Sequence, residues 1–451
     1  MGILPKGMVM AGYDHREIND LEEEILSRMS GKFVNIQDPK KRLGLVTAVA
    51  KTINPAVGEE EIKEIDKDMA NFFPVDELLA DQSIEDIMIN NTESIFVYDT
   101  KEGVKRLDKK LDWGELNKFV GKLKLYATSS AAGGNIMDIH LPTKSRVNVV
   151  SSPRGYDITI RNFKSRPLSM IDLINAGELD YDIAARLWLY VDGFRIRPAN
   201  LLIGGMPAAG KTTLLNAFFS FFRPDMRIIT LEDTYEIDTS TQDNCVALET
   251  NDDLNMKDLV KNVLRMRPDM IIMGEVRGEE ANDMMTTMNI GKIVLGTIHA
   301  SSSRDIINRL QHQPMNVPAD IIPLIDAIVV LSNLYENKKP VRKVVQISEI
   351  AGMETQILLS DLYKIDYKTH KASQSIQNSV TYRDTVARLL GISPTDIIAE
   401  ERIRAVILEK LNKLGRRDIR SINEVVRDYY DNPDLTLKRL GINNMSPAIN
   451  V

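Results

Sequence analysis

The chain has 451 residues, with 57 Lys and Arg against 64 Asp and Glu, a formal net charge of −7 and a single cysteine. The length predicts two or three domains. The mildly acidic balance disfavours a nucleic-acid partner, because nucleic acids attract basic surfaces. Cys245 alone excludes an internal disulfide and a four-cysteine zinc module. The sequence has no uninterrupted apolar run of about 18 residues, so we expect a cytoplasmic protein without direct membrane insertion.

The sequence of the N-terminal third predicts two structural regions. Residues 1–70 are expected to form a helical, variable segment, and residues 71–166 an α+β domain. Helical spacing is found at 113–126, and the polar stretch 164–167, which ends in a proline, is the expected linker to the next domain. Strand-like stretches fall at 95–99, 146–152 and 156–163.

Beyond residue 167, apolar strands alternate with amphipathic helices, which predicts a mostly parallel sheet covered on both faces. This α/β domain is expected over 167–381. Predicted parallel strands lie at 200–205, 227–233, 245–250, 270–275 and 293–300, and antiparallel additions at 327–333, 341–350 and 357–366. Residues 382–451 predict a C-terminal helical tail, with one apolar stripe through Ile403, Ile407, Leu411 and Leu414.

A phosphate-binding loop is the strongest motif. Residues 204–213 read GGMPAAGKTT and satisfy G-x-x-x-x-G-K-[ST]. The motif lies between a predicted strand and a predicted helix, where backbone N–H groups and the helix N-terminus can bind a phosphate. We expect Lys211 to reach the phosphate oxygens and Thr212 to hold Mg²⁺. The expected nucleotide-binding residues are Gly205, Pro207, Ala208, Ala209, Gly210, Lys211, Thr212 and Thr213. The guanine-specifying N-K-x-D pattern is absent, which favours ATP over GTP.

Acidic residues follow two of the predicted strands. Glu275 ends MIIMGE, where it can order Mg²⁺ or take a proton from an attacking water. Glu232 and Asp233 end a second strand, and adjacent carboxylates on an extended chain face opposite ways, so one is expected to lie near the metal. A solvated turn is an equally good interpretation of that pair. His299 follows a third strand and is a candidate contact to phosphate, although a structural histidine is the commoner case.

Two strand-borne arginines are candidates outside the core. Arg146 and Arg161 precede the linker and could reach a nucleotide across a domain or subunit boundary, where an inserted arginine stabilises a transferring phosphoryl group. Ordinary surface arginines are the alternative interpretation.

Four segments stand in order: GMPAAGKT, ITLEDTYE, IIMGEVRG and GTIHASS. Together they resemble the Walker A, Asp box, Walker B and His box of the secretion ATPase superfamily, the motors of type II and type IV secretion, type IV pili and archaella. The resemblance covers roughly residues 75–365 and implies a RecA-like P-loop ATPase core. It implies roles for Glu275 as the Walker B acid, Glu232 as the Asp-box acid and His299 as the His-box residue, with Thr212, Glu232 and Glu275 around Mg²⁺. It also implies that Arg146 and Arg161 close onto the nucleotide.

Within this superfamily, RPANLLIGG, RPDMIIMGEVRG and RLQHQPMNVP resemble the archaeal branch, and the archaellum motor is favoured. The resemblance implies a homo-hexamer that hydrolyses ATP with Mg²⁺ at the inner face of the cytoplasmic membrane. The hexamer would drive assembly or rotation of an archaellum or type IV pilus-like filament through a polytopic platform protein and accessory motor proteins. The alternatives are a type II/IV secretion or pilus assembly ATPase of another archaeal system, and a nucleotide-gated structural ring component.

Overall fold

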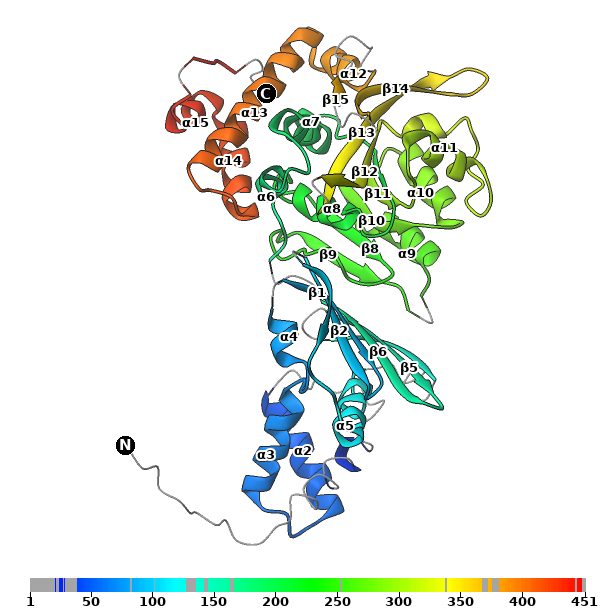
Figure 1. Ribbon diagram of the computed structural model, residues 1–451. Coiled ribbons are helices and arrows are strands. Elements are labelled where there is room, and N and C mark those ends of the chain that lie inside the picture. Colours follow the sequence, from blue (N-terminus) through cyan, green and yellow to red (C-terminus); the bar gives the residue numbers. More distant parts are fainter. Residues whose placement is uncertain are drawn as a thin grey trace. The chain divides into compact units, whose positions relative to one another are not determined.

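The computed structural model describes residues 39–81, 83–100, 102–126, 135–141, 145–162, 166–251, 254–336, 339–366, 372–374, 381–442 and 444–447, together with 21, 24–26 and 28. The chain divides into two compact units, residues 1–165 and 166–451, which are treated separately below (Figure 1). Within the predicted segment 1–70, most of residues 1–38 lie outside the described residues, as do residues 164 and 165 of the predicted linker.

Unit 1 contains a six-stranded antiparallel sheet in the order β3-β2-β1-β6-β5-β4. Its strands are β1 (Ile84–Asn90), β2 (Ser94–Asp99), β3 (Gly103–Leu107), β4 (Ile136–His140), β5 (Arg146–Ser152) and β6 (Gly155–Arg161). Its helices are α2 (Pro39–Ile53), α3 (Glu59–Ala70), α4 (Asp76–Ala80) and α5 (Trp113–Lys124). The predicted strands at 95–99, 146–152 and 156–163 are confirmed as β2, β5 and β6, and the predicted helix at 113–126 as α5. Helix α5 begins at a capping box, in which Asp112 and Glu115 each accept the other's backbone N–H.

Unit 2 is built on a nine-stranded sheet in the order β15-β14-β13-β12-β7-β11-β10-β8-β9. The strands from β12 to β9 in this order pair in parallel, and β13, β14 and β15 add antiparallel pairs at one edge, so the predicted mostly parallel sheet is confirmed. The prediction of 327–333 as an antiparallel addition was wrong on one side, because β12 pairs in parallel with β7 and antiparallel only with β13. The bounds are β7 (Leu201–Gly205), β8 (Ile228–Glu232), β9 (Cys245–Glu249), β10 (Met270–Val276), β11 (Ile293–Ile298), β12 (Ala327–Glu336), β13 (Lys339–Met353), β14 (Ile357–Ile365) and β15 (Ala372–Gln374).

Helices cover both faces of this sheet (Figure 1). On the central strand β7, Leu201 and Ile203 pack into one apolar core and Leu202 packs into the other, because successive side chains point to opposite faces. The first core takes side chains from α6 (Met170–Asn175), α7 (Tyr181–Asp192), α8 (Lys211–Phe218), α12 (Thr381–Leu390), α13 (Pro394–Lys413), α14 (Ile419–Asp431) and α15 (Pro433–Arg439). The second takes them from α9 (Met256–Val263), α10 (Glu280–Asn289) and α11 (Ser303–Gln311).

The predicted apolar stripe of the helical tail is confirmed at three of its four positions. Ile403, Ile407 and Leu411 of α13 are buried, whereas Leu414 is 54% exposed. The prediction was wrong for Leu414 because this residue is the C-cap of α13, where the helix ends.

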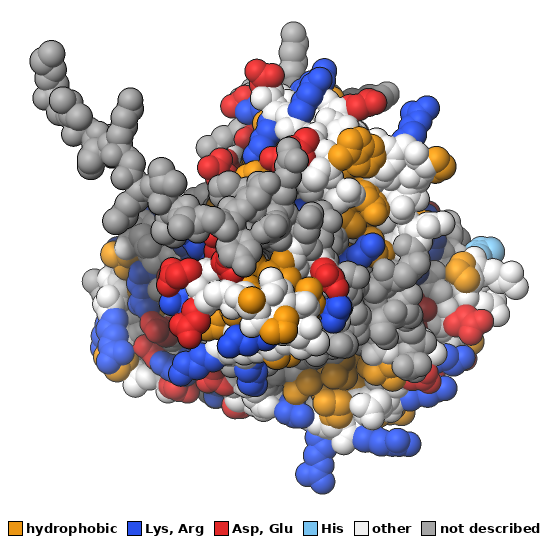
Figure 2. All heavy atoms as spheres, turned by 90° about the horizontal axis from the view of Figure 1, so that it is seen from below, with side chains coloured by type: hydrophobic (Ala, Val, Ile, Leu, Met, Phe, Trp, Pro, Cys, Tyr) orange, Lys and Arg blue, Asp and Glu red, His pale blue; other side chains and the backbone are white. Residues whose placement is uncertain are grey.

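The surface of the described residues carries charges of both signs. On the face drawn in Figure 2, basic and acidic side chains lie interspersed, with smaller groups of apolar side chains between them. None of the described helices has both the length and the apolar character needed to cross a bilayer.

Candidate nucleotide site

The phosphate loop connects the end of β7 to the start of α8. Ala208 and Gly210 adopt left-handed backbone conformations, with φ of 61° and 96°. A Cβ atom at Gly205 would lie 3.0 Å from the carbonyl oxygen of Leu331, so the backbone of β12 leaves no room for a side chain there. The positive φ of Gly210 allows the tight turn into α8, and the N–H groups at a helix N-terminus can bind a phosphate.

Lys211 is the first residue of α8, and its side chain folds back onto the loop. Its Nζ atom donates to the carbonyl oxygens of Gly205 (3.0 Å) and Met206 (3.4 Å) and lies 3.2 Å from Nδ1 of His299. Burial lowers the pKa of Lys211, against the opposing effect of the Glu275 charge. The Lys211 ammonium therefore lies against the phosphate loop, where it could bind phosphate oxygens.

His299 lies between Lys211 and Glu275. Burial and the Lys211 charge lower the pKa of His299, so its ring is neutral at pH 7. Because Lys211 is a donor only, we assign the lone pair to Nδ1 of His299 and the proton to Nε2. Nε2 lies 2.7 Å from Oε1 of Glu275.

Glu275 lies near the end of β10 and is held as a carboxylate. Its Oε2 atom lies 2.6 Å from Nη2 of Arg277. Burial favours the neutral acid, but the hydrogen bond and charge of Arg277 outweigh it and lower the pKa of Glu275. The three parallel strands β7, β10 and β11 therefore bring Lys211, Glu275 and His299 together at one edge of the sheet, as expected where the carboxyl ends of parallel strands meet.

Glu232 ends β8 and is almost fully buried, at 2% exposure. Its Oε1 atom accepts the backbone N–H groups of Glu236 (2.9 Å) and Ile237 (3.0 Å), and its Oε2 atom has no hydrogen-bond partner among the described residues. A Cβ atom at Gly274 would lie 2.9 Å from Cγ of Glu232, so the glycine gives the Glu232 side chain its place beside β10. The adjacent Asp233 is exposed and accepts from the Thr250 hydroxyl, so the two carboxylates have different surroundings.

Burial raises the pKa of Glu232 to about 7, although the two backbone hydrogen bonds act in the opposite direction. Its ionised fraction in the free protein therefore increases as pH rises through 7. If the carboxylate form of Glu232 supports hydrolysis, kcat/KM should fall about tenfold per pH unit below about pH 6. Rates measured at saturating Mg²⁺ test this. The pH profile of Glu232→Gln should lack the titration of Glu232. Titration of the substrate affects the profiles of the native protein and of the variant equally. Identical pH profiles would contradict the role.

Ionisation of Glu232 is expected to lower the stability of the fold, whereas it is expected to support hydrolysis. The folded protein keeps the Glu232 proton up to about pH 7, whereas the unfolded chain releases it near the ordinary value of 4.5. The contribution of this group to stability is thus complete below pH 4.5 and is lost as pH rises to about 7.

Arg342 of β13 is a loop contact that sequence reasoning missed. Its Nε atom donates to the carbonyl oxygen of Ala208 (3.1 Å), and its Cδ atom lies 3.4 Å from the position that a Cβ of Gly210 would take. The β12–β13 hairpin extends beyond the end of β7, because Leu331 pairs with Gly205 and Arg342 pairs with the later residue Asn333. This hairpin therefore holds the strained Ala208 conformation from one side. No motif marks Arg342, since 134 residues separate it from Ala208.

Arg342→Ala is expected to weaken nucleotide binding about 10-fold, because one charge-assisted hydrogen bond to the loop is lost. Equilibrium titration with a fluorescent ADP analogue measures this. Lys343→Ala is the matched control, because successive side chains of β13 point to opposite faces. Equal effects of the two variants, or no effect of either, would show that Arg342 does not position the loop.

The two predicted N-terminal arginines lie on neighbouring strands of unit 1. Arg146 of β5 pairs directly with Arg161 of β6. Arg146 lies 3.7 Å from an oxygen of Asp138, and Arg161 lies 3.6 Å from an oxygen of Asp86. Their approach to a nucleotide stays a prediction.

The residues at the sheet edge fit Mg²⁺ and ATP. Within the described parts of the chain, no three His, Cys, Asp or Glu side chains converge to hold a metal by themselves. This agrees with Mg²⁺ chemistry, since Mg²⁺ keeps several waters and is bound through one or two protein groups plus substrate phosphates. The unpartnered oxygen of Glu232, the ionised Glu275 and the half-buried Thr212 supply such groups. When bound, Mg²⁺ would neutralise charge on the phosphates.

The fold and this site define a P-loop ATPase core. Residues 68–426 match the family described as type II/IV secretion system protein, and the chain belongs to this family. Members of the family are ATPases, and the protein is an ATPase.

Three individual proteins illustrate the similarity. The uncharacterized protein MJ0900 of Methanocaldococcus jannaschii is 27% identical over 454 residues, covering 95% of this chain and 81% of that protein. The probable conjugal transfer protein TrbB of Sinorhizobium fredii is 31% identical over 236 residues, covering 50% of this chain and 69% of that protein. The crystal structure of the pilus retraction motor PilT with bound ADP is 16% identical, with a TM-score of 0.45, and covers 79% of this chain and 92% of that chain.

Proposed function

We propose that the protein is a homo-hexameric, Mg²⁺-dependent motor ATPase that works at the inner face of the cytoplasmic membrane. It drives assembly or rotation of an archaellum or type IV pilus-like filament through a membrane platform protein. The observation that carries the ATPase part is the chain of contacts from Lys211 through His299 to Glu275, formed at one sheet edge beside the phosphate loop. The archaeal sequence features described above support the choice of filament.

In this site, Lys211 and the loop N–H groups bind the phosphates, and Thr212 helps to hold Mg²⁺. Glu275 orients or deprotonates the attacking water. His299 contacts both Lys211 and Glu275, so a phosphate that draws Lys211 away from the loop carbonyls also changes the surroundings of Glu275. Arg146 and Arg161 supply charge from unit 1. This arrangement connects the state of the nucleotide to movement of the chain.

Lys211→Ala tests the site. We expect this variant to lower the rate of phosphate release by at least about 100-fold, because a cation that stabilises transition-state charge is removed. Lys257→Ala is the control, since Lys257 lies on the exposed side of α9 and pairs with Glu279. Unchanged phosphate release in Lys211→Ala would refute the assignment.

The second candidate is an ATPase of a type IV secretion system, which the similarity to a conjugal transfer protein favours. Cells that carry Lys211→Ala separate the two functions: loss of motility supports the filament motor, and loss of secretion supports the secretion ATPase. A nucleotide-gated structural ring would instead keep its function in a variant that binds ATP without hydrolysing it. Sedimentation with a non-hydrolysable ATP analogue tests the hexamer.

A further inference from the structure

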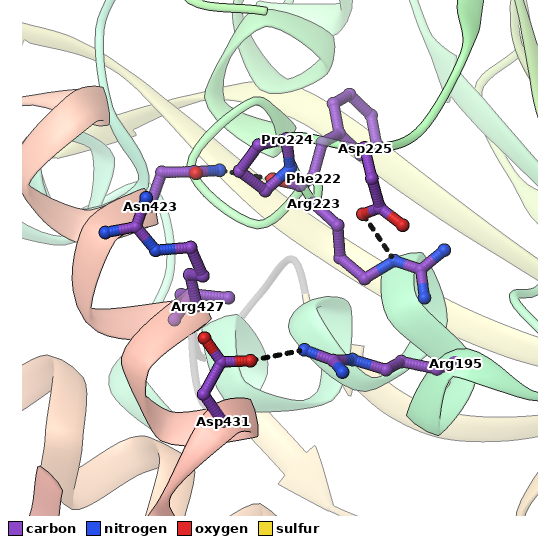
Figure 3. Close-up of a pocket in the computed structure, with 9 residues that line it drawn as sticks. Arg195, Phe222, Arg223, Pro224, Asp225, Asn423, Arg427 and Asp431 are labelled. Carbon is purple, nitrogen blue, oxygen red and sulfur yellow. Dashed lines mark hydrogen bonds and ion pairs between the residues drawn. The ribbon is translucent and has the colours of Figure 1, made fainter.

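Unit 2 has a pocket of about 290 Å³ that the nucleotide site does not use (Figure 3). Its wall is formed by the turn after α7, the loop that precedes β8, and helix α14. Three arginines come from these three segments: Arg195, Arg223 and Arg427. Three apolar residues also belong to the lining: Pro224 is exposed, whereas Phe222 and Val426 are almost fully buried.

The pocket lies at the sheet edge opposite the nucleotide site. Arg223 belongs to the loop before β8, whereas Glu232 ends that strand on the nucleotide side. Strand β8 has five residues and so spans about 16 Å. A ligand in this pocket would therefore not compete with ATP for space.

The loop before β8 is fixed by two side-chain amides. Gln242, which is 5% exposed, donates through Nε2 to the carbonyl oxygens of Arg223 (2.8 Å) and Met226 (3.1 Å). Asn423 of α14 donates to the carbonyl oxygens of Phe219 (3.2 Å) and Phe222. The loop thus has a defined shape before any ligand binds, which lowers the entropy cost of binding.

Arg195 is presented by a strained turn. Gly193, Phe194 and Arg195 have consecutive positive φ angles of 49°, 54° and 63°, a conformation that residues other than glycine rarely adopt. Such strain persists only where the surroundings enforce it, and it concentrates at binding sites. The guanidinium of Arg195 lies over the ring of Tyr430, 4.7 Å from its centroid.

A buried ion pair enforces this turn. Asp192 accepts the backbone N–H of Phe194 (2.9 Å) and pairs with Arg404 (2.9 Å), and both charged side chains are almost inaccessible to solvent. The guanidinium of Arg404 lies 4.6 Å from the centroid of the Phe194 ring. This network therefore fixes the conformation of the turn that carries Arg195.

The arginines of the pocket are paired loosely with exposed carboxylates. Arg195 lies 3.5 Å from Asp431, Arg223 lies 3.6 Å from Asp225, and Arg427 lies 3.7 Å from Asp428. The three aspartate side chains are 64%, 76% and 41% exposed. These separations exceed the usual hydrogen-bond range, and exposed ion pairs of this kind contribute little stability. A carboxylate from a ligand can therefore displace the resident aspartates.

We propose that this pocket binds a short acidic segment of a partner protein, in which a carboxylate side chain adjoins an apolar one. Guanidinium groups match carboxylates in shape and charge. Pro224, the exposed apolar residue of the lining, gives the neighbouring side chain a surface to pack against.

Selection from a random heptapeptide display library on the full-length protein tests this proposal, with Arg195→Gln/Arg427→Gln protein used for counter-selection. The expected result is enrichment of Asp or Glu next to Leu, Ile or Phe. No enrichment, or enrichment of basic or purely apolar sequences, would overturn the proposal. This outcome is independent of the proposed motor function, because the readout is peptide binding.

A selected peptide, labelled with a fluorophore, then measures affinity by anisotropy. Arg427→Gln is expected to weaken binding about 10-fold. Arg427→Lys should weaken it by less, because lysine keeps the charge but lacks the planar guanidinium that binds a carboxylate through two nitrogens. Arg420→Gln, on the same helix but outside the pocket lining, should bind as the wild type does. Equal affinity of wild type and both Arg427 variants, or displacement of the peptide by millimolar inorganic phosphate, would refute a carboxylate-specific site. Basal ATP hydrolysis should be unchanged in the Arg427 variants.

Discussion

Replacing Glu275 with glutamine is expected to lower the rate of ATP hydrolysis by about 100-fold or more, because general-base and charge effects of a positioned carboxylate are typically of this size. Glutamine keeps the size of the side chain but removes its charge. It also leaves His299 and Arg277 facing a neutral group, since both contact the Glu275 oxygens in the native protein. Nucleotide affinity should change by less than about threefold, because Lys211 and the loop N–H groups bind the phosphates.

Steady-state phosphate release and equilibrium binding of a fluorescent ADP analogue together measure the two quantities. Glu279→Gln provides the control: it removes the same charge four residues along the chain, where the carboxylate pairs with exposed Lys257. Two results would count against the role of Glu275. One is a variant that keeps more than a tenth of the native rate, and the other is a parallel loss of rate and binding.

The parallel core was predictable because its signals are local. Polar residues lie at or next to the ends of three apolar strands, with Glu232 at the end of β8, Glu275 near the end of β10 and His299 just after β11. The phosphate loop identifies the sheet edge that these strand ends share. These local signals predict that Glu275 and His299 lie at the same sheet edge as Lys211, and the structure brings the three side chains together. Alternation of side chains along an extended chain also predicts different surroundings for Glu232 and Asp233, although a solvated turn is an equally good interpretation of that sequence.

Other features were not predictable because they depend on contacts between distant segments. Strand β3 has the pattern GVKRL, in which Val104 is 63% exposed, so no buried alternation marks it as a strand. Arg342 looks like one of many surface cations until the hairpin places it against Ala208. The pKa of Glu232 also follows from burial and not from its place in a motif.

Removing the buried guanidinium of Arg404 should destabilise unit 2 by about 3–5 kcal/mol, because breaking a buried ion pair leaves uncompensated charge behind. Arg404 is fully buried and contacts Asp192 (2.9 Å) and Glu400 (3.2 Å). It also lies over the ring of Trp188, 4.9 Å from its centroid. In Arg404→Ala, Asp192 would lose the charge that offsets its burial, and burial already raises the pKa of Asp192.

The two tryptophans of the chain allow unit 2 to be followed by itself. Trp113 lies in unit 1 and Trp188 in unit 2, so a Trp113→Phe background leaves fluorescence from unit 2 alone during denaturation. The double variant Asp192→Asn/Arg404→Met should lose less stability than the sum of the single variants, because both charges leave the interior together. Tyr429→Phe, which removes only a hydroxyl that donates to Glu400, should cost about 1 kcal/mol. If Arg404→Ala costs no more than this control, the buried ion pair does not stabilise the turn that presents Arg195.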